Sequence, residues 1–246
     1  MTRIPFGGRR LAAALAGALF LASSVDLSAQ AIPTTTPAPR TDEWWVKMHE
    51  KFLGERKKAV EDDSCKLLFL GDSITQGWGG NATWQKYYTP RGALNFGIGG
   101  DRTEHVLWRI QNGEIEGLHP KAVMLMIGTN NAGSNSADEI AAGVEAIVAE
   151  LRKSLPESEI LLLGVFPRSE KPDATRAKLQ KVNDRIAKLD ADPKVHYLDI
   201  GKAFLEEDGS ISKEIMPDFL HLSAEGYERW AKAVEPTLAK LLGEKS

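Results

Sequence analysis

Short apolar runs alternate with longer amphipathic segments along most of this chain. The apolar runs predict buried strands at 66–70, 93–98, 122–127, 160–166 and 195–200. The amphipathic segments predict helices at 42–60, 103–111, 138–154, 173–189 and 224–242. Because a helix between two strands usually joins them in parallel, the alternation predicts an α/β/α sandwich around a mainly parallel five-stranded sheet.

The length and net charge of the chain limit the number of domains it can form and the kinds of partner it can bind. A chain of 246 residues is long enough for one sizeable α/β domain and too short for two comfortable ones. The formal net charge of -3 gives no basic surface for nucleic acid, so no nucleic-acid partner is expected. Cys65 is the only cysteine, which leaves no internal disulfide to support the core.

The N-terminus has the layout of an export signal. Arg3, Arg9 and Arg10 precede an apolar run over 11–25, and Ala29-Gln30-Ala31 supplies a small-residue cleavage pattern. We therefore expect an exported protein, periplasmic or secreted, without a stable membrane anchor. A retained anchor and a twin-arginine signal are the alternatives.

The expected domain boundaries follow from this layout. Residues 1–31 are the predicted signal peptide, and the Pro/Thr-rich segment 32–41 is expected to be an extended, mobile linker. A single domain is then expected over 42–246, beginning with the helix 42–60.

Aromatic residues gather in two places before the second strand. Trp44 and Trp45 fall in the helix 42–60, where we expect both to serve packing rather than binding. Trp84 and Tyr88 are four residues apart, which is typical of a buried helix face. Trp78 follows the first strand and is a candidate for stacking on a sugar ring.

The first strand ends at Gly71-Asp72-Ser73, and a helix-like segment follows. A serine at this position lies where α/β folds bind their ligands, and the nearby helix N-terminus favours negative charge. We therefore interpret Ser73 as a nucleophile. The alternative interpretation of the same triplet is a plain turn or helix cap.

Three later segments carry groups that such a serine would need. Gly97-Ile98-Gly99-Gly100 predicts a tight turn with bare backbone N–H groups, and Asn130 offers a neutral amide donor. His221 is a candidate general base, with Asp218 three residues earlier to orient its ring. Taken singly, each is also explained as a turn, a cap or a structural histidine.

Together these segments resemble the SGNH, or GDSL, hydrolase family. Ser73, Gly100, Asn130 and His221 match its four signature positions. The resemblance covers about residues 65–242 and is closest to the catalytic subunits of intracellular platelet-activating-factor acetylhydrolases. It is carried by residues 95–101, 105–109, 128–131, 167–172 and 219–222.

The resemblance implies a flavodoxin-like fold and a Ser-His-Asp esterase made of Ser73, His221 and Asp218. It places the oxyanion hole at the Ser73 and Gly100 N–H groups and the Asn130 side chain. Candidate substrate-binding residues are Asp72, Trp78 and Arg168. No cofactor or metal is expected, since no His, Cys, Asp or Glu cluster has ligand spacing. The related subunits pair, so a homodimer is a further expectation.

The expected reaction is hydrolysis of short-chain, acetyl-type esters on carbohydrates or small molecules. A lysophospholipase or general lipid carboxylesterase is the second possibility, and a carbohydrate-binding protein with a relic site is the third. The related subunits are cytosolic, whereas this chain carries an export signal and the added aromatic helix. Platelet-activating factor is therefore not the expected natural substrate.

Overall fold

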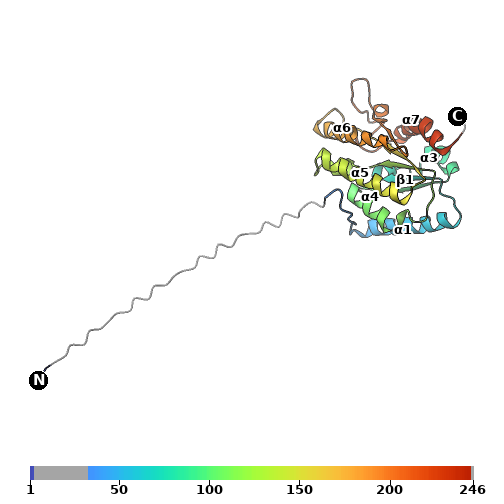
Figure 1. Cartoon of the computed structure of the whole chain (residues 1–246). Helices are drawn as coiled ribbons and strands as arrows, with labels where there is room; N and C mark the ends of the chain where they lie inside the picture. The colour runs from blue at the N-terminus through green and yellow to red at the C-terminus, as the bar shows by residue number, and fades with distance from the viewer. Residues whose placement is uncertain (3–32, 245–246) are drawn as a thin grey trace. The chain divides into compact units, whose positions relative to one another are not determined.

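Among the residues that the structure describes, five parallel strands form a single sheet in the order β2-β1-β3-β4-β5. The computed structural model describes residues 1–2 and 33–244 (Figure 1), so nearly all of the predicted signal peptide lies outside the described residues. The chain divides into residues 1–30 and a unit from residue 31 onward, and the fold is that of the second unit. The strands are β1 (Leu67–Gly71), β2 (Ala93–Gly97), β3 (Ala122–Met126), β4 (Glu159–Leu163) and β5 (Val195–Leu198).

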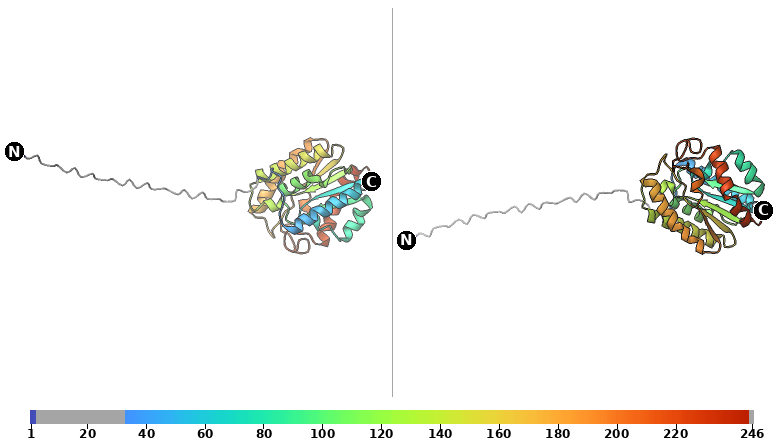
Figure 2. Two further views of the ribbon diagram at one scale, coloured as in Figure 1. Left: turned by 90° about the horizontal axis from the view of Figure 1, so that it is seen from below. Right: turned by 90° about the horizontal axis from the view of Figure 1, so that it is seen from above.

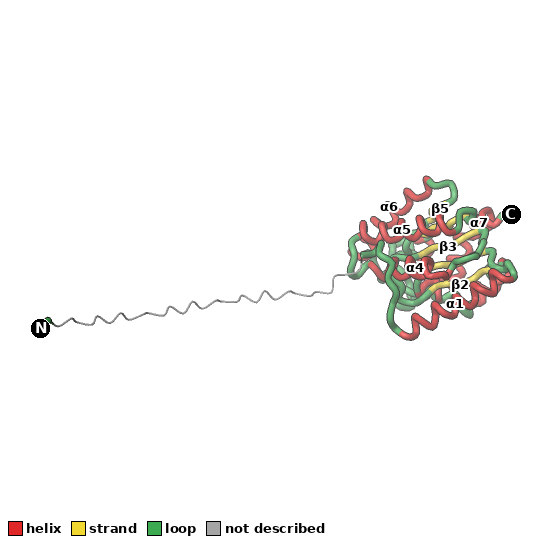
Figure 3. Tube along the Cα trace, turned by 60° about the horizontal axis from the view of Figure 1, so that its bottom comes forward, coloured by secondary structure: helices red, strands yellow, loops and turns green. Residues whose placement is uncertain are grey.

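Helices cover both faces of the sheet (Figures 2 and 3). They are α1 (Glu43–Glu61), α2 (Ser73–Gln76), α3 (Ala82–Tyr87), α4 (Thr103–Arg109), α5 (Ala137–Ser154), α6 (Ala174–Ile186) and α7 (Ala224–Leu242). One core half joins α1, α4, α5 and α6 to the sheet, and the other is formed with α7 and the segment after β1. The predicted three-layer fold with a parallel sheet is confirmed.

Alternation along the strands explains the two core halves. Leu68 and Leu70 of β1 face the half built with α1, α4, α5 and α6, whereas Leu67 and Phe69 face the half built with α7. Successive side chains of a strand point to opposite faces, so a strand that is apolar at every position must be covered on both. All five residues of β1 are buried, as this requires.

The strand register brings the loops after β1, β2 and β3 together at the carboxyl ends of the strands. Gly71, the last residue of β1, pairs with Gly97 of β2 and with Met126 of β3, so the loops after these three strands start at one level. The strand order is that of flavodoxin-like sheets, in which ligands bind beyond the carboxyl ends of the strands near the β1/β3 switch point.

Most predicted boundaries hold, and the departures have local causes. Helix α1 begins after Asp42, whose carboxylate accepts the Trp45 N–H at 3.0 Å, and α7 covers the predicted residues. Strand β4 stops at Leu163 rather than 166 because the Asn183 side chain binds both the N–H and the C=O of Val165. Helix α4 passes at Ile110 into a π-helical turn that ends at Glu114.

The Pro/Thr-rich segment is not the free linker that its composition predicts. From residue 33 onward it packs on the helical layer: Thr34 and Ala38 are buried, and the Ala38 N–H donates to the Glu104 carbonyl at 3.1 Å. The Thr34 hydroxyl donates to the Glu139 carbonyl, at 2.5 Å. We call residues 33–41 the arm. Its contacts use backbone groups of α4 and α5, which composition alone does not reveal.

Between residues 33 and 244, no helix has the length and apolar character needed to cross a lipid bilayer.

Candidate active site

Ser73 is the first residue of α2, and only Asp72 separates it from the end of β1. The Asp72 carboxylate accepts the Ile74 N–H at 2.9 Å and so caps this short helix. Tyr227 of α7 donates to the Ile74 carbonyl at 2.7 Å, which ties the turn to the helix that packs on the same face of the sheet. Ser73 is half-buried, and its N–H, as that of a first helical residue, has no partner within the helix.

His221 and Asp218 lie in the loop before α7 and meet Ser73. The Ser73 Oγ and His221 Nε2 are 2.8 Å apart, and His221 Nδ1 lies 2.7 Å from Asp218 Oδ2. The other Asp218 oxygen accepts the N–H groups of Leu220 and His221 at 3.1 and 2.7 Å. Partial burial acts to raise the pKa of Asp218, but these hydrogen bonds outweigh it and lower the pKa below its ordinary value.

A left-handed residue shapes this loop. Phe219, between Asp218 and His221, has φ of 60°, which is uncommon for a bulky side chain. Its carbonyl accepts the N–H of Ser169, another left-handed residue, at 2.9 Å. The bond fastens the histidine loop to the segment after β4.

The glycine turn and Asn130 approach the same edge from β2 and β3. Gly100 has φ of 78°, a left-handed conformation that glycine adopts without strain, and its N–H has no acceptor in the part of the chain that the structure describes. The Gln76 side chain of α2 accepts the Gly99 N–H at 3.0 Å. The Asn130 side-chain amide donates one of its two protons to the Asp101 carbonyl at 2.8 Å, and the second proton is available to a ligand.

A buried ionic network lies behind this turn. The Arg109 guanidinium contacts Asp101 at 2.8 Å and also contacts Glu114, and all three side chains are fully buried. Arg109 donates as well to the carbonyls of Phe96 and Gly71, near the ends of β2 and β1. His49 of α1 completes the network through Glu114 at 3.1 Å. The network therefore ties α1 and α4 to the ends of two central strands.

Two of the three predicted substrate-binding residues do not reach the surface. Asp72 and Trp78 are both fully buried, and Trp78 packs among Tyr88, Tyr227 and Trp230. The prediction for these two is wrong, because α7 covers the segment after β1. Burial raises the pKa of Asp72 to about 7. Arg168 is partly exposed, donates to Thr129 Oγ1 at 3.2 Å beside Asn130, and stays a prediction.

Two residues outside the predicted site approach the glycine turn. Arg40 of the arm donates to the Gly99 carbonyl at 2.6 Å. Trp44, in the first turn of α1, is 46% exposed and lies beside Gly99, whereas Trp45 is buried as expected. The expectation that Trp44 serves packing is therefore wrong. Trp45, His49 and Phe52 are the buried side of α1, and Trp44 falls outside that stripe, a signal present in the sequence.

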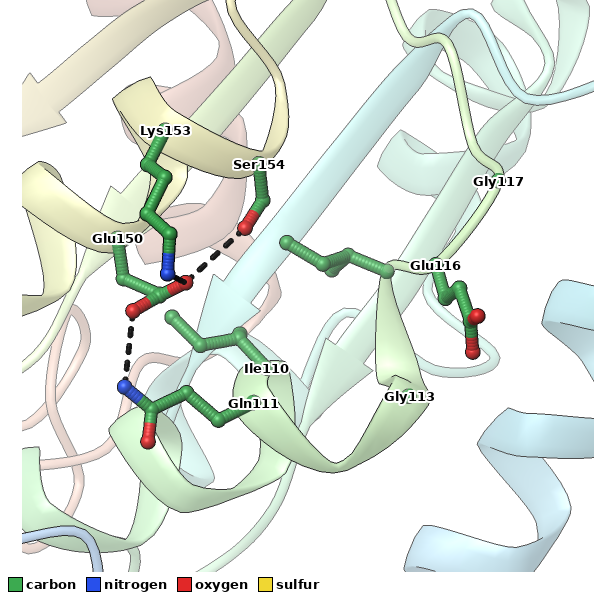
Figure 4. Close-up of a pocket in the computed structure, with 9 residues that line it drawn as sticks. Ile110, Gln111, Gly113, Glu116, Gly117, Glu150, Lys153 and Ser154 are labelled. Carbon is green, nitrogen blue, oxygen red and sulfur yellow. Dashed lines mark hydrogen bonds and ion pairs between the residues drawn. The ribbon is translucent and has the colours of Figure 1, made fainter.

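Two further features of the described residues can be compared with this site: possible metal ligands and the depression beside α5. Among the described residues, no cluster of His, Cys, Asp or Glu is placed to hold a metal ion. A depression of about 630 Å³ lies between the π-helical turn and the end of α5 (Figure 4). Its central carboxylate, Glu150, already accepts hydrogen bonds from Gln111, Lys153 and Ser154. The depression contains none of Ser73, Asp218 and His221.

Comparison with known proteins gives the family. Residues 69–229 match the model of the GDSL-like Lipase/Acylhydrolase family. The chain belongs to this family. Human platelet-activating factor acetylhydrolase IB subunit alpha1 is 37% identical over 223 residues, which are 89% of this chain and 94% of the human one. The rat alpha2 subunit is 40% identical over 223 residues, 90% of this chain and 95% of the rat one.

The GDSL protein is accordingly a carboxylic ester hydrolase, as its sequence predicts. An acetylxylan esterase from Geobacillus stearothermophilus shares the fold, with a TM-score of 0.58 at 21% identity over 73% of this chain and 94% of that one. The family model begins at residue 69, but the mammalian relatives align with 89–90% of this chain, a share large enough to include the arm and α1. The expectation that the aromatic helix is an addition to the relatives is therefore wrong.

Proposed function

We propose that Ser73, His221 and Asp218 act as the catalytic triad of this esterase. His221 Nε2 takes the proton of Ser73 Oγ while the oxygen attacks the ester carbonyl, and the imidazolium then returns the proton to the departing alkoxide. A water molecule, deprotonated in the same way, hydrolyses the acyl-serine and releases the acid. The continuous contact from Ser73 through His221 to Asp218, at 2.8 and 2.7 Å, is the observation that carries this proposal.

The oxyanion hole in this proposal is formed by the N–H groups of Ser73 and Gly100 and the Asn130 amide. All three belong to segments that leave neighbouring strands at the same level of the sheet. Fixed donors of this kind stabilise the charge that develops on the carbonyl oxygen without reorganising during the reaction. The Asp101 and Gln76 contacts hold two of these segments in place before substrate arrives.

The acyl group we propose is acetyl, and the proposed alcohol is a carbohydrate or a similar polar molecule. The names of the mammalian relatives support an acetyl ester. The exposure of the His221 and Asp218 side chains, 45% and 56%, supports an open site that accepts a bulky alcohol. An acetylxylan esterase has the same fold, which shows that the fold can present such a site.

A lipid ester is the second candidate. Platelet-activating factor, the substrate in the relatives' name, is a lipid, and those relatives align with nearly the whole of this chain. A series of p-nitrophenyl esters from acetate to octanoate separates the candidates. We expect kcat/KM to be highest for acetate and to fall as the acyl chain lengthens. A maximum at a long chain would favour a general lipid esterase.

The triad is tested with Ser73→Ala, with Ser154→Ala on the surface of α5 as the matched control. We expect Ser73→Ala to lose p-nitrophenyl acetate hydrolysis and Ser154→Ala to keep it. Full activity in Ser73→Ala, with an unchanged circular dichroism spectrum, would refute the assignment.

We propose in addition that residues 1–31 direct export, so that the enzyme meets its substrate outside the cytoplasm. The arginine-led apolar run and the Ala29-Gln30-Ala31 pattern support this. N-terminal sequencing of protein recovered from the exported fraction tests it, with Ile32 as the expected first residue.

A further inference from the structure

The segment before the family match reaches the catalytic edge. The arm crosses α4 and α5, where Thr103 Oγ1 donates to the Thr34 carbonyl at 3.2 Å and the Ala38 N–H donates to Glu104. Helix α1 then starts at Glu43, with Asp42 as its cap. This route carries the first turn of α1 to the glycine turn that follows β2.

Trp44 stands next to the proposed nucleophile. A Cβ placed on Gly99 would lie 3.7 Å from the Trp44 ring atom Cη2 and 3.7 Å from the Ser73 Cβ. The indole tip and the Ser73 side chain are therefore separated by no more than twice that distance. Trp44 is 46% exposed, although its neighbour Trp45 is fully packed. An exposed indole this close to the reacting hydroxyl lies within reach of the alcohol part of a bound ester.

The charges around Trp44 favour a neutral ligand. Arg40 lies beside the same turn, with Nη1 bonded to the Gly99 carbonyl at 2.6 Å. Its Nε is 3.0 Å from Asp42, which offsets its charge, and its Nη1 is 3.6 Å from Asp101, whose carboxylate is shared with Arg109. A phosphate headgroup would meet little uncompensated positive charge here. A sugar ring, which is neutral and has an apolar face, suits an indole flanked by a compensated ion pair.

We propose that Trp44 is the leaving-group platform of this esterase, on which the sugar ring that carries the acetyl ester stacks. This inference rests on the proposed function, because it takes Ser73 as the nucleophile. Trp44 sets which esters are preferred and takes no part in the proton transfers. Arg40 bonds Asp42 and the Gly99 carbonyl, so it holds the first turn of α1 against the glycine turn and fixes the position of the indole relative to Ser73.

The test compares two acetyl esters that differ in the alcohol. Peracetylated xylobiose presents a sugar ring, and ethyl acetate has an alcohol too small to reach the indole. In Trp44→Ala we expect kcat/KM for the sugar ester to fall about tenfold or more, mainly through KM, and kcat/KM for ethyl acetate to change less than about threefold. Trp44→Phe, which keeps an aromatic face, should retain most of the preference.

Val46→Ala is the matched control, because Val46 is 39% exposed on the same turn of α1 and should leave both rates unchanged. If the ratio of the two kcat/KM values is the same in wild type and Trp44→Ala, the platform is refuted while Ser73-dependent hydrolysis of ethyl acetate still upholds the proposed function. If the wild type hydrolyses no ester, the proposed function itself fails. Light scattering supplies a separate readout: a wild-type dimer that Trp44→Ala converts to a monomer, with the ratio unchanged, would assign the indole to an interface between two copies.

Discussion

Trp45 Nε1 donates a 2.7 Å hydrogen bond to the Asp101 carboxylate, a buried contact between residues 56 positions apart. Asp101 follows Gly100, and its carbonyl accepts the Asn130 amide. Its other carboxylate oxygen is held by Arg109 at 2.8 Å. One side chain of α1 thus helps to fix a residue that touches two of the three proposed oxyanion donors.

Replacing Trp45 by Phe should therefore affect both stability and turnover. The ring packing is largely kept, but a fully buried carboxylate oxygen loses its donor, which typically costs about 1–3 kcal/mol. We expect a lower midpoint of urea unfolding and a kcat reduced several-fold with KM nearly constant. Trp108→Phe is the matched control, since the Trp108 ring packs at a tilt against Trp45, with centroids 5.4 Å apart, and its indole N–H makes no hydrogen bond within the described residues. If the two variants have the same urea midpoint and the same kcat, the hydrogen bond from Trp45 to Asp101 does not support the oxyanion donors.

Asp218→Asn should reduce activity through the orientation of His221. An amide in place of the carboxylate no longer stabilises the imidazolium and can favour the wrong ring tautomer. We expect kcat to fall about 10²–10⁴-fold, a wide range because Asp218 is partly exposed to water. Asp208→Asn, in an exposed turn before the same loop, serves as the control and should keep wild-type kinetics. A loss confined to KM would contradict this role of Asp218.

Asn130→Ala removes the side-chain donor of the proposed oxyanion hole. Loss of one such donor typically lowers turnover about 10²–10³-fold, and this loss should appear in kcat. Asn112→Ala removes an exposed amide that bonds only the Trp108 carbonyl, and it should leave turnover unchanged. Steady-state kinetics on p-nitrophenyl acetate measure kcat for both variants. A normal kcat in Asn130→Ala would leave the hole to backbone groups alone.

The sequence predicts what depends on local pattern. Apolar runs and turn residues predict the strand β1 and the cap and length of α7. They also predict that Ser73 and Asn130 follow strands and that His221 lies just before α7. These features need no knowledge of which helix covers which face. The same holds for the order Ser73, Gly100, Asn130, His221, which the family resemblance uses.

What the sequence does not predict depends on contacts between distant segments. Trp78 is buried because Tyr227 and Trp230 of α7 close over it, and nothing near residue 78 indicates this. The arm looks like a linker because prolines and threonines have no periodicity, yet the Ala38 N–H and the Thr34 hydroxyl bind backbone carbonyls of α4 and α5. The exposure of Trp44 is an intermediate case, since the periodicity of α1 separates it from Trp45 only once the buried stripe is known.

Asp72 should make stability fall as the pH rises. Its side chain is fully buried, Oδ1 caps α2 at 2.9 Å from the Ile74 N–H, and Oδ2 has no hydrogen-bond partner among the described residues. Burial raises its pKa from 3.8 to about 7; the Asp101 charge acts in the same direction, and the hydrogen bond from the Ile74 N–H and the His221 charge act against it. Between these two values the folded state holds a proton that the unfolded state has released.

The contribution of Asp72 is therefore fully present below about pH 4 and is lost as the pH rises to about 7, an effect of at most about 4 kcal/mol. Asp72→Asn keeps the capping oxygen but cannot ionise, so its free energy of unfolding should decline less than that of the wild type over this range. Urea titrations at pH 4.5, 6 and 7.5 measure how steeply the free energy of unfolding changes with pH in the wild type and in Asp72→Asn. Asp208→Asn is the control: hydrogen bonds from Ser210 lower the pKa of Asp208, so its contribution is lost only at a more acidic pH and this variant should follow the wild type between pH 4.5 and 7.5. Parallel slopes for wild type and Asp72→Asn would mean that Asp72 stays in one protonation state across this range, and that some other group sets the pH dependence.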